Sequence, residues 1–590
     1  MTTHPHFLRA AKRPTTPVRQ WFTVAGSSMA HSEGNTMVHR LQALDAVCGV
    51  RMPRGGRFNH VPQRFSDAVG FWDWVWQRSL RNCTPWLVCY NGRWLMHLLE
   101  LEAEIERSNI EIVTNWDGSG PLFLRLRKPH PSGGRPLRLR VICHTNIWRN
   151  TPISEMAASI HNPEELGDEF DSTSTAATAD VLSRMMEGWT QALVDGDLGS
   201  MQPTIGRQAM SAVKRRVGTR ELLVHGNPTV QRIERSAYLG GRVEARVGRY
   251  PEAYEADIPS CYPTIMQDWM MPGRLVEVAD IGFHGPHHAM LRDYLKRFLV
   301  IASVTVEQNV PAIPRRIERG GASHPVGERF RAVLPTPWLE WALERDYIHA
   351  VGTVLAYEPT GVLGDLMSDL VAARNVAMHR GNVAGAQTLK VLANAVHGKM
   401  GQRQRKWEDV AGVYPPEEFW HGWFGPMDFD LSENPECYEW RWRDQGAQRL
   451  VRSEGFETLT AIAAHTSAHA RLQLWELLDT ADRVAEDGLG WYYADTDGLY
   501  VSRPARDALR RNGGNLRITG PFELEVLARK QYRKDGRLVA AGLPANARQM
   551  SPELWETDRW PAWQMGASDE PGRIRVYGQS WRIRGIDNRL

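Results

Sequence analysis

The chain has 590 residues, 42% of them hydrophobic, which is enough apolar material for about two to four packed domains. Its 71 lysines and arginines against 68 acids leave a net charge of +3, so overall charge barely favours a nucleic-acid partner. No apolar run approaches the roughly 18 residues of a membrane span, and no secretory signal opens the sequence. Six cysteines without metal-binding spacing indicate reduced thiols in a cytoplasmic protein.

In chain order, the first segment with the residue types of a catalytic site runs from Tyr254 to Met266. Asp257 ends a short strand, a turn with Pro and Ser follows, and Tyr262-Pro263 opens an apolar helix. The competing interpretation of Asp257 is a helix N-cap.

The second segment continues an Ala-rich helical stretch that begins near Leu363. Lys390, Asn394 and His397 lie at i, i+4 and i+7 and therefore share one helix face. A lysine there is suited to a triphosphate, although most lysines are simply solvated.

The third segment, Trp491–Tyr500, contains Asp495 and Asp497 one residue apart within an aromatic run. Turn residues on both sides predict a strand, a hairpin and a second strand. Burying two carboxylates without a cation costs several kcal/mol each, so the tip either binds metal or is an exposed, solvated turn.

Together, these segments resemble the three polymerase motifs of family B DNA polymerases. Asp257–Pro263 is similar to D-x-x-S-L-Y-P, with Cys261 in place of Leu. Lys390–Gly398 is similar to K-x-x-x-N-S-x-Y-G, with Ala395 for Ser and His397 for Tyr. Tyr493–Gly498 is similar to Y-x-D-T-D-S, with Gly498 for Ser.

Two shorter segments extend the resemblance. Lys530-Gln531-Tyr532 resembles the K-x-Y motif and is followed by Ala541–Pro544 as the family pattern requires. Tyr238–Gly241 resembles the Y-x-G-G segment of protein-primed members, which joins their exonuclease and polymerase parts.

The resemblance implies an α+β fold, a right-hand polymerase (palm, fingers and thumb) preceded by an RNase H-like exonuclease-type domain. The expected units are an exonuclease-like domain (1–200), a linker (201–226), the first part of the palm (227–269), an insertion resembling a terminal-protein-binding region (270–345), palm and fingers helices (346–400), a second insertion (401–450), the palm with the catalytic hairpin and K-x-Y strand (451–544), and a thumb (545–590).

The same resemblance implies a catalytic site of Asp257, Asp495 and Asp497 that works with two Mg²⁺ ions, for which Mn²⁺ can substitute. The expected metal ligands are Asp257, Asp497 and the backbone carbonyl of Ile258, and Asp495 stands nearby on the primer side.

The resemblance also assigns residues to the substrates. The residues expected to bind the nucleotide are Ile258, Tyr262, Arg374, Arg380, Lys390, Asn394 and His397, where Arg374 and Arg380 compete for one role. The residues expected to bind DNA are Tyr238, Gly240, Gly241, Lys530 and Tyr532. Because His397 replaces a tyrosine, sugar discrimination is in question.

The exonuclease acids of the family are largely absent. In the aligned first strand, Ala25 and Ser27 stand where two acids belong, and Leu95 replaces the acid that follows Asn91. A late helix keeps Asp180, with Ala176 in place of its tyrosine, while Asp45 and Asp73 are the acids that a different alignment would choose. We therefore expect a retained fold without proofreading.

The sequence thus predicts a DNA-directed DNA polymerase of a phage or mobile element, acting in the cytoplasm of a bacterial or phage-infected cell. Its expected partners are primer-template DNA and dNTPs, with a terminal protein as a candidate for priming, and no membrane. Two alternatives stay open: a template- or primer-independent polymerase, and a non-catalytic nucleic-acid-binding protein.

Overall fold

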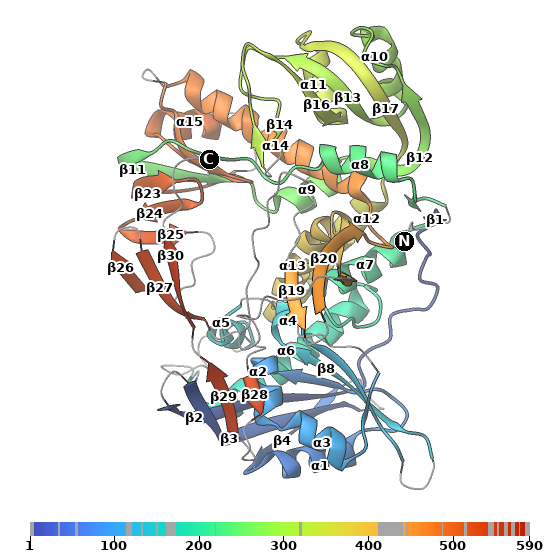
Figure 1. The fold of residues 1–590 in the computed structure, drawn as a ribbon, viewed down its shortest axis with the longest axis vertical. Helices are drawn as coiled ribbons and strands as arrows, with labels where there is room; N and C mark the ends of the chain where they lie inside the picture. Colours follow the sequence, from blue (N-terminus) through green and yellow to red (C-terminus); the bar gives the residue numbers. More distant parts are fainter. Residues whose placement is uncertain are drawn as a thin grey trace.

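The structure is a computed structural model that describes residues 5–33, 36–52, 57–113, 121–130, 134–148, 151–160, 171, 173–218, 220–317, 321–410, 440–443, 446–485, 488–511, 516–540, 548–551, 554–559, 565–567, 573–577 and 579–584. In Figure 1, the N-terminal domain lies at the bottom, a bundle of helices lies above it, and two further sheets lie at the top. Within these ranges, no helix has the length and apolar character needed to cross a bilayer.

The N-terminal domain is built on one mixed sheet with strand order β28-β29-β3-β2-β5-β8-β7-β6, and β4 pairs with β3. Strands β2 and β5 and strands β5 and β8 are parallel, as an RNase H-like domain requires. The strands are β2 (Gln20–Glu33), β3 (Thr36–Arg51), β4 (Phe58–Phe65), β5 (Trp86–Cys89), β6 (Glu111–Ile112), β7 (Phe123–Lys128), β8 (Leu137–Cys143), β28 (Met565–Ala567) and β29 (Arg573–Tyr577).

Helices cover both faces of this sheet. Helices α1 (Ala68–Arg78), α2 (Gly92–Leu98) and α3 (Leu101–Arg107) contribute to the core on one face. Helices α4 (Thr145–Trp148), α5 (Ile153–Ala158) and α6 (Thr175–Asp195) contribute to the core on the other face. That second core continues without interruption into the helices of the fingers, so the two units share apolar side chains.

The segment expected to be a linker is largely structured. Helix α7 (Ile205–Arg216) buries Ile205, Ala209 and Val213, which lie on one face at helical spacing, and β9 (Leu223–Val224) pairs with β1 (His6–Phe7). Helix α8 (Pro228–Ala237) follows, with Asn227 as its N-cap. The prediction of a simple linker over 201–226 missed the amphipathic pattern of α7.

The palm is a sheet with strand order β10-β21-β22-β11-β23-β24-β25. Its strands are β10 (Val243–Ala245), β11 (Gly248–Asp257), β21 (Trp491–Asp495), β22 (Gly498–Val501), β23 (Arg517–Ala528), β24 (Gln531–Lys534) and β25 (Arg537–Ala540). Helices α14 (Thr460–Arg483) and α15 (Arg503–Arg511) pack on one face through Leu474, Leu478 and Leu509.

The first insertion is a separate antiparallel sheet of order β12-β17-β13-β16, formed by β12 (Met271–Asp280), β13 (Leu299–Glu307), β16 (Arg329–Pro335) and β17 (Ile348–Thr360). Helices α10 (His288–Arg297) and α11 (Thr336–Leu343) cover it, and a small ribbon pairs β14 (Arg315–Arg316) with β15 (Ala322–Ser323). The unit therefore ends at Thr360, not at 345, because β17 completes its sheet.

The fingers are the antiparallel helices α12 (Val362–His379) and α13 (Val383–Met400), which pack beside α9 (Cys261–Asp268). In the second insertion, β18 (Arg403–Val410), β19 (Trp440–Arg443) and β20 (Gly446–Glu454) form a sheet, while 411–439 lie outside the described residues.

The expected thumb divides in two. Strands β26 (Arg548–Ser551), β27 (Leu554–Arg559) and β30 (Gln579–Arg584) form their own sheet, whereas β29 pairs with β3 of the N-terminal domain. The C-terminal segment thus bridges to the first domain of the chain (Figure 1). The expected Ala541–Pro544 segment lies outside the described residues.

Candidate active site

The three acids of the sequence motifs meet at one end of the palm sheet. Strand β11 lies between β22 and β23, and Asp257 at its end pairs with Gly498 on one side and Arg517 on the other. The amide of Ile258 donates to the backbone carbonyl of Asp497 at 2.8 Å. Asp257 is therefore adjacent to the Asp495/Asp497 turn, although Asp495 lies 238 positions further along the sequence.

The turn itself is tight. Thr496 has φ of 64°, the left-handed conformation, and the amide of Asp497 donates to the carbonyl of Asp495 at 2.8 Å. The amide of Thr496 also donates to the carbonyl of Arg242 at 2.8 Å. A side chain at Gly241 would collide with Thr496, because an added Cβ would lie 2.2 Å from its Oγ1. This close approach explains the glycine of the Tyr238–Gly241 segment.

The carboxylates repel each other, and basic side chains partly compensate. Burial, and then the charge of Asp257, raises the pKa of Asp497. Lys530 Nζ contacts both carboxylate oxygens of Asp495 at 2.6 and 2.7 Å, and an Arg517 nitrogen lies 2.8 Å from Asp257 Oδ2. Burial, with the charges of Asp497 and Asp257, also raises the pKa of the neighbouring Cys261 thiol to about 12, so that thiol is protonated at neutral pH.

The oxygen atoms at this end of the sheet are of the type that binds a hard divalent cation. Asp257 and Asp497 are close enough to influence each other, and backbone oxygens lie beside them, which is the oxygen-only environment that Mg²⁺ prefers. Among the described residues, no three His, Cys, Asp or Glu side chains converge as a ready-made metal cage. Asp495 is turned toward Lys530, which leaves two carboxylates for a metal, and Mg²⁺ commonly binds through one or two.

Three aromatic rings connect the separate motifs. His397 stacks on Tyr262 with ring centroids 4.1 Å apart and 22° between planes, and Tyr238 meets His397 edge-on at 6.0 Å. Burial lowers the pKa of His397 to about 4, so its ring is neutral at physiological pH. Its Nδ1 is buried and has no hydrogen-bond partner among the described residues. Burial also raises the pKa of Tyr262.

The remaining residues expected at the nucleotide fall into two groups. Lys390, Asn394 and Arg374 are exposed on the helices of the fingers, and the side-chain amide of Asn394 donates to the Lys390 carbonyl at 3.2 Å. Arg380 instead forms an ion pair with Asp195 of α6 at 2.6 Å. That contact favours Arg374 over Arg380 for a role at the nucleotide.

On the other side of the sheet, Tyr532 and Lys530 are already engaged. The hydroxyl of Tyr500 donates to the hydroxyl of Tyr532 at 2.9 Å, and the amide of Lys530 donates to the Tyr493 hydroxyl at 3.2 Å. These bonds hold the K-x-Y segment against the catalytic hairpin. Gly240, in contrast, faces open space and is exposed.

Sequence reasoning missed two buried arginines behind the hairpin. Arg471 of α14 donates to the Gly240 carbonyl at 2.8 Å, and Arg242 donates to the Pro311 carbonyl of the first insertion at 2.9 Å. Burial lowers the pKa of Arg471 to about 10, with the positive charge of Arg242 adding to the shift. Only the tertiary structure brings these groups together, so their spacing in the sequence could not predict that they are neighbours.

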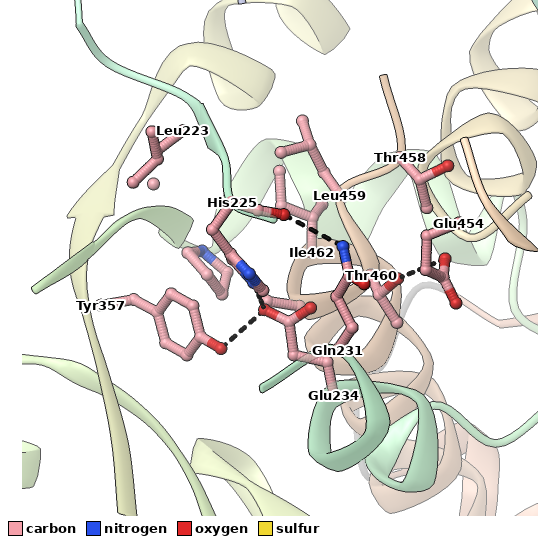
Figure 2. Close-up of a pocket in the computed structure, with 13 residues that line it drawn as sticks. Leu223, His225, Gln231, Glu234, Tyr357, Glu454, Thr458, Leu459, Thr460 and Ile462 are labelled. Atoms are coloured by element: carbon pink, nitrogen blue, oxygen red, sulfur yellow. Dashed lines mark hydrogen bonds and ion pairs between the residues drawn. The ribbon is translucent and has the colours of Figure 1, made fainter. Parts of the chain in front are cut away.

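A pocket lies where α8, β17 and the start of α14 meet, and Figure 2 shows its lining side chains. Glu234 accepts from the Tyr357 hydroxyl at 2.7 Å and contacts His225 Nε2 at 2.9 Å. Gln231 donates to the His225 carbonyl at 3.0 Å. This network connects α8 to β17 immediately before Tyr238. We therefore interpret it as structural support for the candidate active site, not as a second active site.

A wide groove runs between the N-terminal domain, α7, α13 and the second insertion. Its charged lining is mostly basic: Arg125, Arg207, Lys214, Arg235, Lys399, Arg403 and Arg452 against Glu457. Asn394 and Gly398 of α13 also line it. The groove therefore connects the motif-bearing helix of the fingers with a positive surface.

In the N-terminal domain, three of the positions aligned with nuclease acids are filled by the apolar Ala25 and Leu95 and by Asp180, which is paired. Ala25 is 1% exposed and packs with Val47 and Ala179, and Leu95 is fully buried. Asp180 forms an ion pair with Arg184 at 2.8 Å. The alternative acid Asp45 pairs across the sheet with Ala25.

Both alternative acids are also engaged by arginines. Arg64 contacts both carboxylate oxygens of Asp45 at 3.0 and 3.1 Å, and Arg107 lies 2.9 Å from Asp73. The Thr175 hydroxyl donates to Asp45 at 2.5 Å. Asn91, in left-handed conformation, precedes α2. Among the described residues of this domain, the acids are therefore dispersed.

Comparison with known proteins agrees with this arrangement. The family model "DNA polymerase type B, organellar and viral" matches residues 177–411. Residues 177–411, which carry Asp257 and Lys390, are thus similar to type B DNA polymerases. No curated protein matches the sequence.

Solved structures of the phage phi29 DNA polymerase resemble the chain along its length. The complex of that enzyme with primer-template DNA and incoming nucleotide matches with a TM-score of 0.60 and 13% identity, covering 96% of this chain and 100% of the other. Its complex with single-stranded DNA gives 0.57 and 15% with the same coverage. At such identity the likeness establishes the fold: a right-hand polymerase preceded by an exonuclease-type domain, as the sequence predicted.

The charge balance of the hairpin leads to a prediction on stability. Because the pKa of Asp497 is raised, its charged form is disfavoured in the folded protein, and Asp497→Asn is expected to raise the midpoint of thermal unfolding at neutral pH. The gain should shrink as the pH falls through that raised pKa, where the wild-type carboxyl is protonated.

Asp495→Asn is the matched control, because it leaves Lys530 without its carboxylate partner and is expected to lower the midpoint. Calorimetry of both variants at several pH values measures the effect. Equal losses in both variants would show that the hairpin is not under charge repulsion.

Proposed function

We propose that the chain is a template-directed DNA polymerase that adds dNTPs to a primer 3′-hydroxyl by two-metal nucleotidyl transfer, and that it does so without 3′–5′ proofreading. The observation that carries the proposal is the adjacency of Asp257 and Asp497 across paired strands of the palm. The matches to a type B family model and to the phi29 polymerase fold support it.

Asp257, Asp497 and the carbonyl of Ile258 would hold the metal ions. When bound, Mg²⁺ activates the primer hydroxyl and neutralises charge on the triphosphate. Asp495 is held by Lys530 on the K-x-Y side of the sheet, where that lysine also faces the primer strand in our proposal. The protein's share of catalysis is therefore positioning and charge compensation, as phosphoryl-type transfers require.

The nucleotide would lie between Tyr262 and the helices of the fingers. Lys390 supplies a point charge for the triphosphate, and the exposed Arg374 supplies a second. Tyr262 lies under the sugar, and its ring is held in place by the neutral His397 stacked on it. A buried imidazole in this place keeps the stacking contact while adding no charge beside the triphosphate.

DNA would follow the positive surfaces. The basic groove beside α13 suits the phosphates of a template strand, because lysine and arginine contacts bind the backbone without reading sequence. Gly240 presents bare backbone next to the hairpin, which lets a strand approach closely.

Protein priming is a further part of the proposal. The first insertion packs its own core against α14 through Ala468 and Trp475, and it is anchored to the palm through Arg242. An insertion of similar placement holds the terminal protein in the protein-primed subgroup that the sequence resembles. A phage or mobile-element origin follows from the same resemblance.

Primer extension tests the reaction itself. We expect a labelled primer annealed to a template to be extended with Mg²⁺ and all four dNTPs, and Asp497→Asn to reduce the rate by at least about a thousand-fold, since a metal ligand contributes several kcal/mol. Addition of one dNTP type without template would favour the template-independent alternative. Unchanged replication in cells carrying Asp497→Asn would leave only the binding interpretation.

Absence of proofreading is tested separately. A primer with a mismatched 3′ end, labelled at its 5′ end and incubated with Mg²⁺ but without dNTPs, is expected to keep its full length, because Ala25 and Leu95 replace ligands and Asp45 is paired with Arg64. Shortening of the primer one nucleotide at a time, abolished by Asp45→Asn, would show that a nuclease site exists around Asp45.

Arg517 is expected to weaken binding of metal at Asp257. The ion pair is between a 67% exposed arginine and a carboxylate, and such pairs are worth about 0.2–1 kcal/mol. Arg517→Gln should therefore lower the Mg²⁺ concentration for half-maximal extension by a factor between about 1.4 and about 5. Binding of Mn²⁺, followed by electron paramagnetic resonance, should tighten to the same extent.

Arg249→Gln is the matched control for Arg517→Gln. Arg249 pairs with Glu525 between the same two strands, β11 and β23, at the opposite end of β11. It should leave the metal dependence unchanged. A shift of equal size in the two variants would mean that general surface charge, not the contact with Asp257, sets the metal requirement.

A further inference from the structure

Two cysteines stand side by side in the sheet of the N-terminal domain. Cys89 ends β5 and Cys143 ends β8, and the parallel register pairs them directly, next to each other across the ladder. Both side chains belong to the same core on one face of the sheet. Directly paired positions on neighbouring strands fall within the Cα separation that a disulfide spans, about 4.4–6.8 Å.

Among the described residues, hydrogen-bond donors converge on one of the two sulfurs. The Gly92 amide donates to Cys143 Sγ at 3.3 Å, and the Thr145 hydroxyl donates to it at 3.1 Å. His144 Nδ1 lies 3.6 Å from the same sulfur, and its ring stacks on Tyr90 with centroids 4.7 Å apart. These groups stabilise negative charge on sulfur.

The two thiols therefore differ in acidity. Burial alone would raise the pKa of Cys143, but His144, Thr145 and the Gly92 amide outweigh it and lower that pKa to about 7. Burial, with the nearby Cys143 charge, raises the pKa of Cys89 well above its usual value. One sulfur is thus a nucleophile at neutral pH and its neighbour is a protonated thiol, a division of roles that suits an attacking and a resolving cysteine.

The other cysteines in the described part of the chain lack this environment. Burial raises the pKa of Cys48, Cys83 and Cys261. Cys83 is the most exposed of the five described cysteines, all of which are free. The most exposed described cysteine, Cys83, is therefore not the one with the lowered pKa, Cys143. The order in which the two are oxidised thus tests the chemistry of the pair.

We propose that Cys143 and Cys89 form a redox-active pair that hydrogen peroxide converts to a disulfide. The Cys143 thiolate attacks one peroxide oxygen, the O–O bond breaks, and hydroxide leaves, so that Cys143 becomes a sulfenic acid. The Cys89 sulfur then attacks the Cys143 sulfur, the S–O bond breaks, and the Cys89 proton and the hydroxyl leave as water. The peroxide is reduced by two electrons, and the two thiols are oxidised by two.

The geometry favours a small oxidant. Cys143 is 9% exposed and Cys89 is fully buried, so hydrogen peroxide reaches the pair more readily than a bulky disulfide reagent. The site is at the strand ends of the exonuclease-type domain, and Thr145 and Asn146, just beyond Cys143, line the basic groove. It is chemically independent of the polymerase centre and does not rest on the proposed function.

The test uses the whole wild-type chain. It is treated with hydrogen peroxide at pH 8, the remaining thiols are alkylated after denaturation, and peptides are analysed by mass spectrometry. The expected product is a Cys89–Cys143 disulfide that forms before Cys83 is oxidised, at a rate that rises with pH through about 7. Oxidation of Cys83 first, with Cys89 and Cys143 alkylated in full, would overturn the proposal.

Substitution separates the two roles. Cys89→Ser should accumulate sulfenic acid on Cys143, trapped by a 1,3-dione, whereas Cys143→Ser should leave Cys89 reduced. Cys83→Ser is the matched control and should form the disulfide at the wild-type rate. Trapping of sulfenic acid on Cys89 in the Cys143→Ser variant would reverse the assignment and reject it.

Discussion

The active end of this polymerase depends on the position of one strand. Because β11 lies between β22 and β23, Asp257 is adjacent to the turn that carries Asp497. Burial and the charge of Asp257 raise the pKa of Asp497, so the charged form of this carboxyl is disfavoured in the folded chain. The contacts of Lys530 and Arg517 with neighbouring carboxylates partly offset that cost. Carboxylates with perturbed pKa values are typical of functional sites.

The rest of the polymerase part keeps that turn and its approach in place. Gly241 allows the Y-x-G-G segment to lie against Thr496, and the carbonyl of Arg242 accepts the amide of the turn. Tyr238, His397 and Tyr262 then join that segment to the helix of the fingers and to α9. Positions far apart in the chain are thereby fixed relative to one another by packing and short hydrogen bonds.

The N-terminal domain has a structural role that does not require nuclease chemistry. Trp148 donates to Thr388 of α13 at 3.1 Å, Asn382 donates to the Gly188 carbonyl at 3.0 Å, and Arg380 pairs with Asp195. A shared apolar core runs through the same interface. The domain therefore supports the fingers, which gives a physical reason for its fold that is independent of nuclease activity.

The local sequence was sufficient to predict the elements around each motif. Alternating aromatic and apolar residues with a tight turn predicted β21 and β22, and the Ala-rich helical spacing predicted α12 and α13. Only the tertiary structure determined the order of the strands in each sheet and the contact of Arg380 with the N-terminal domain. It also showed that α7 occupies the segment expected to be a linker, and that Arg242 and Arg471 converge behind the hairpin. The reason is physical: local spacing governs helix faces and turns, whereas strand order and the burial of charge are set by long-range packing that no short stretch of sequence encodes.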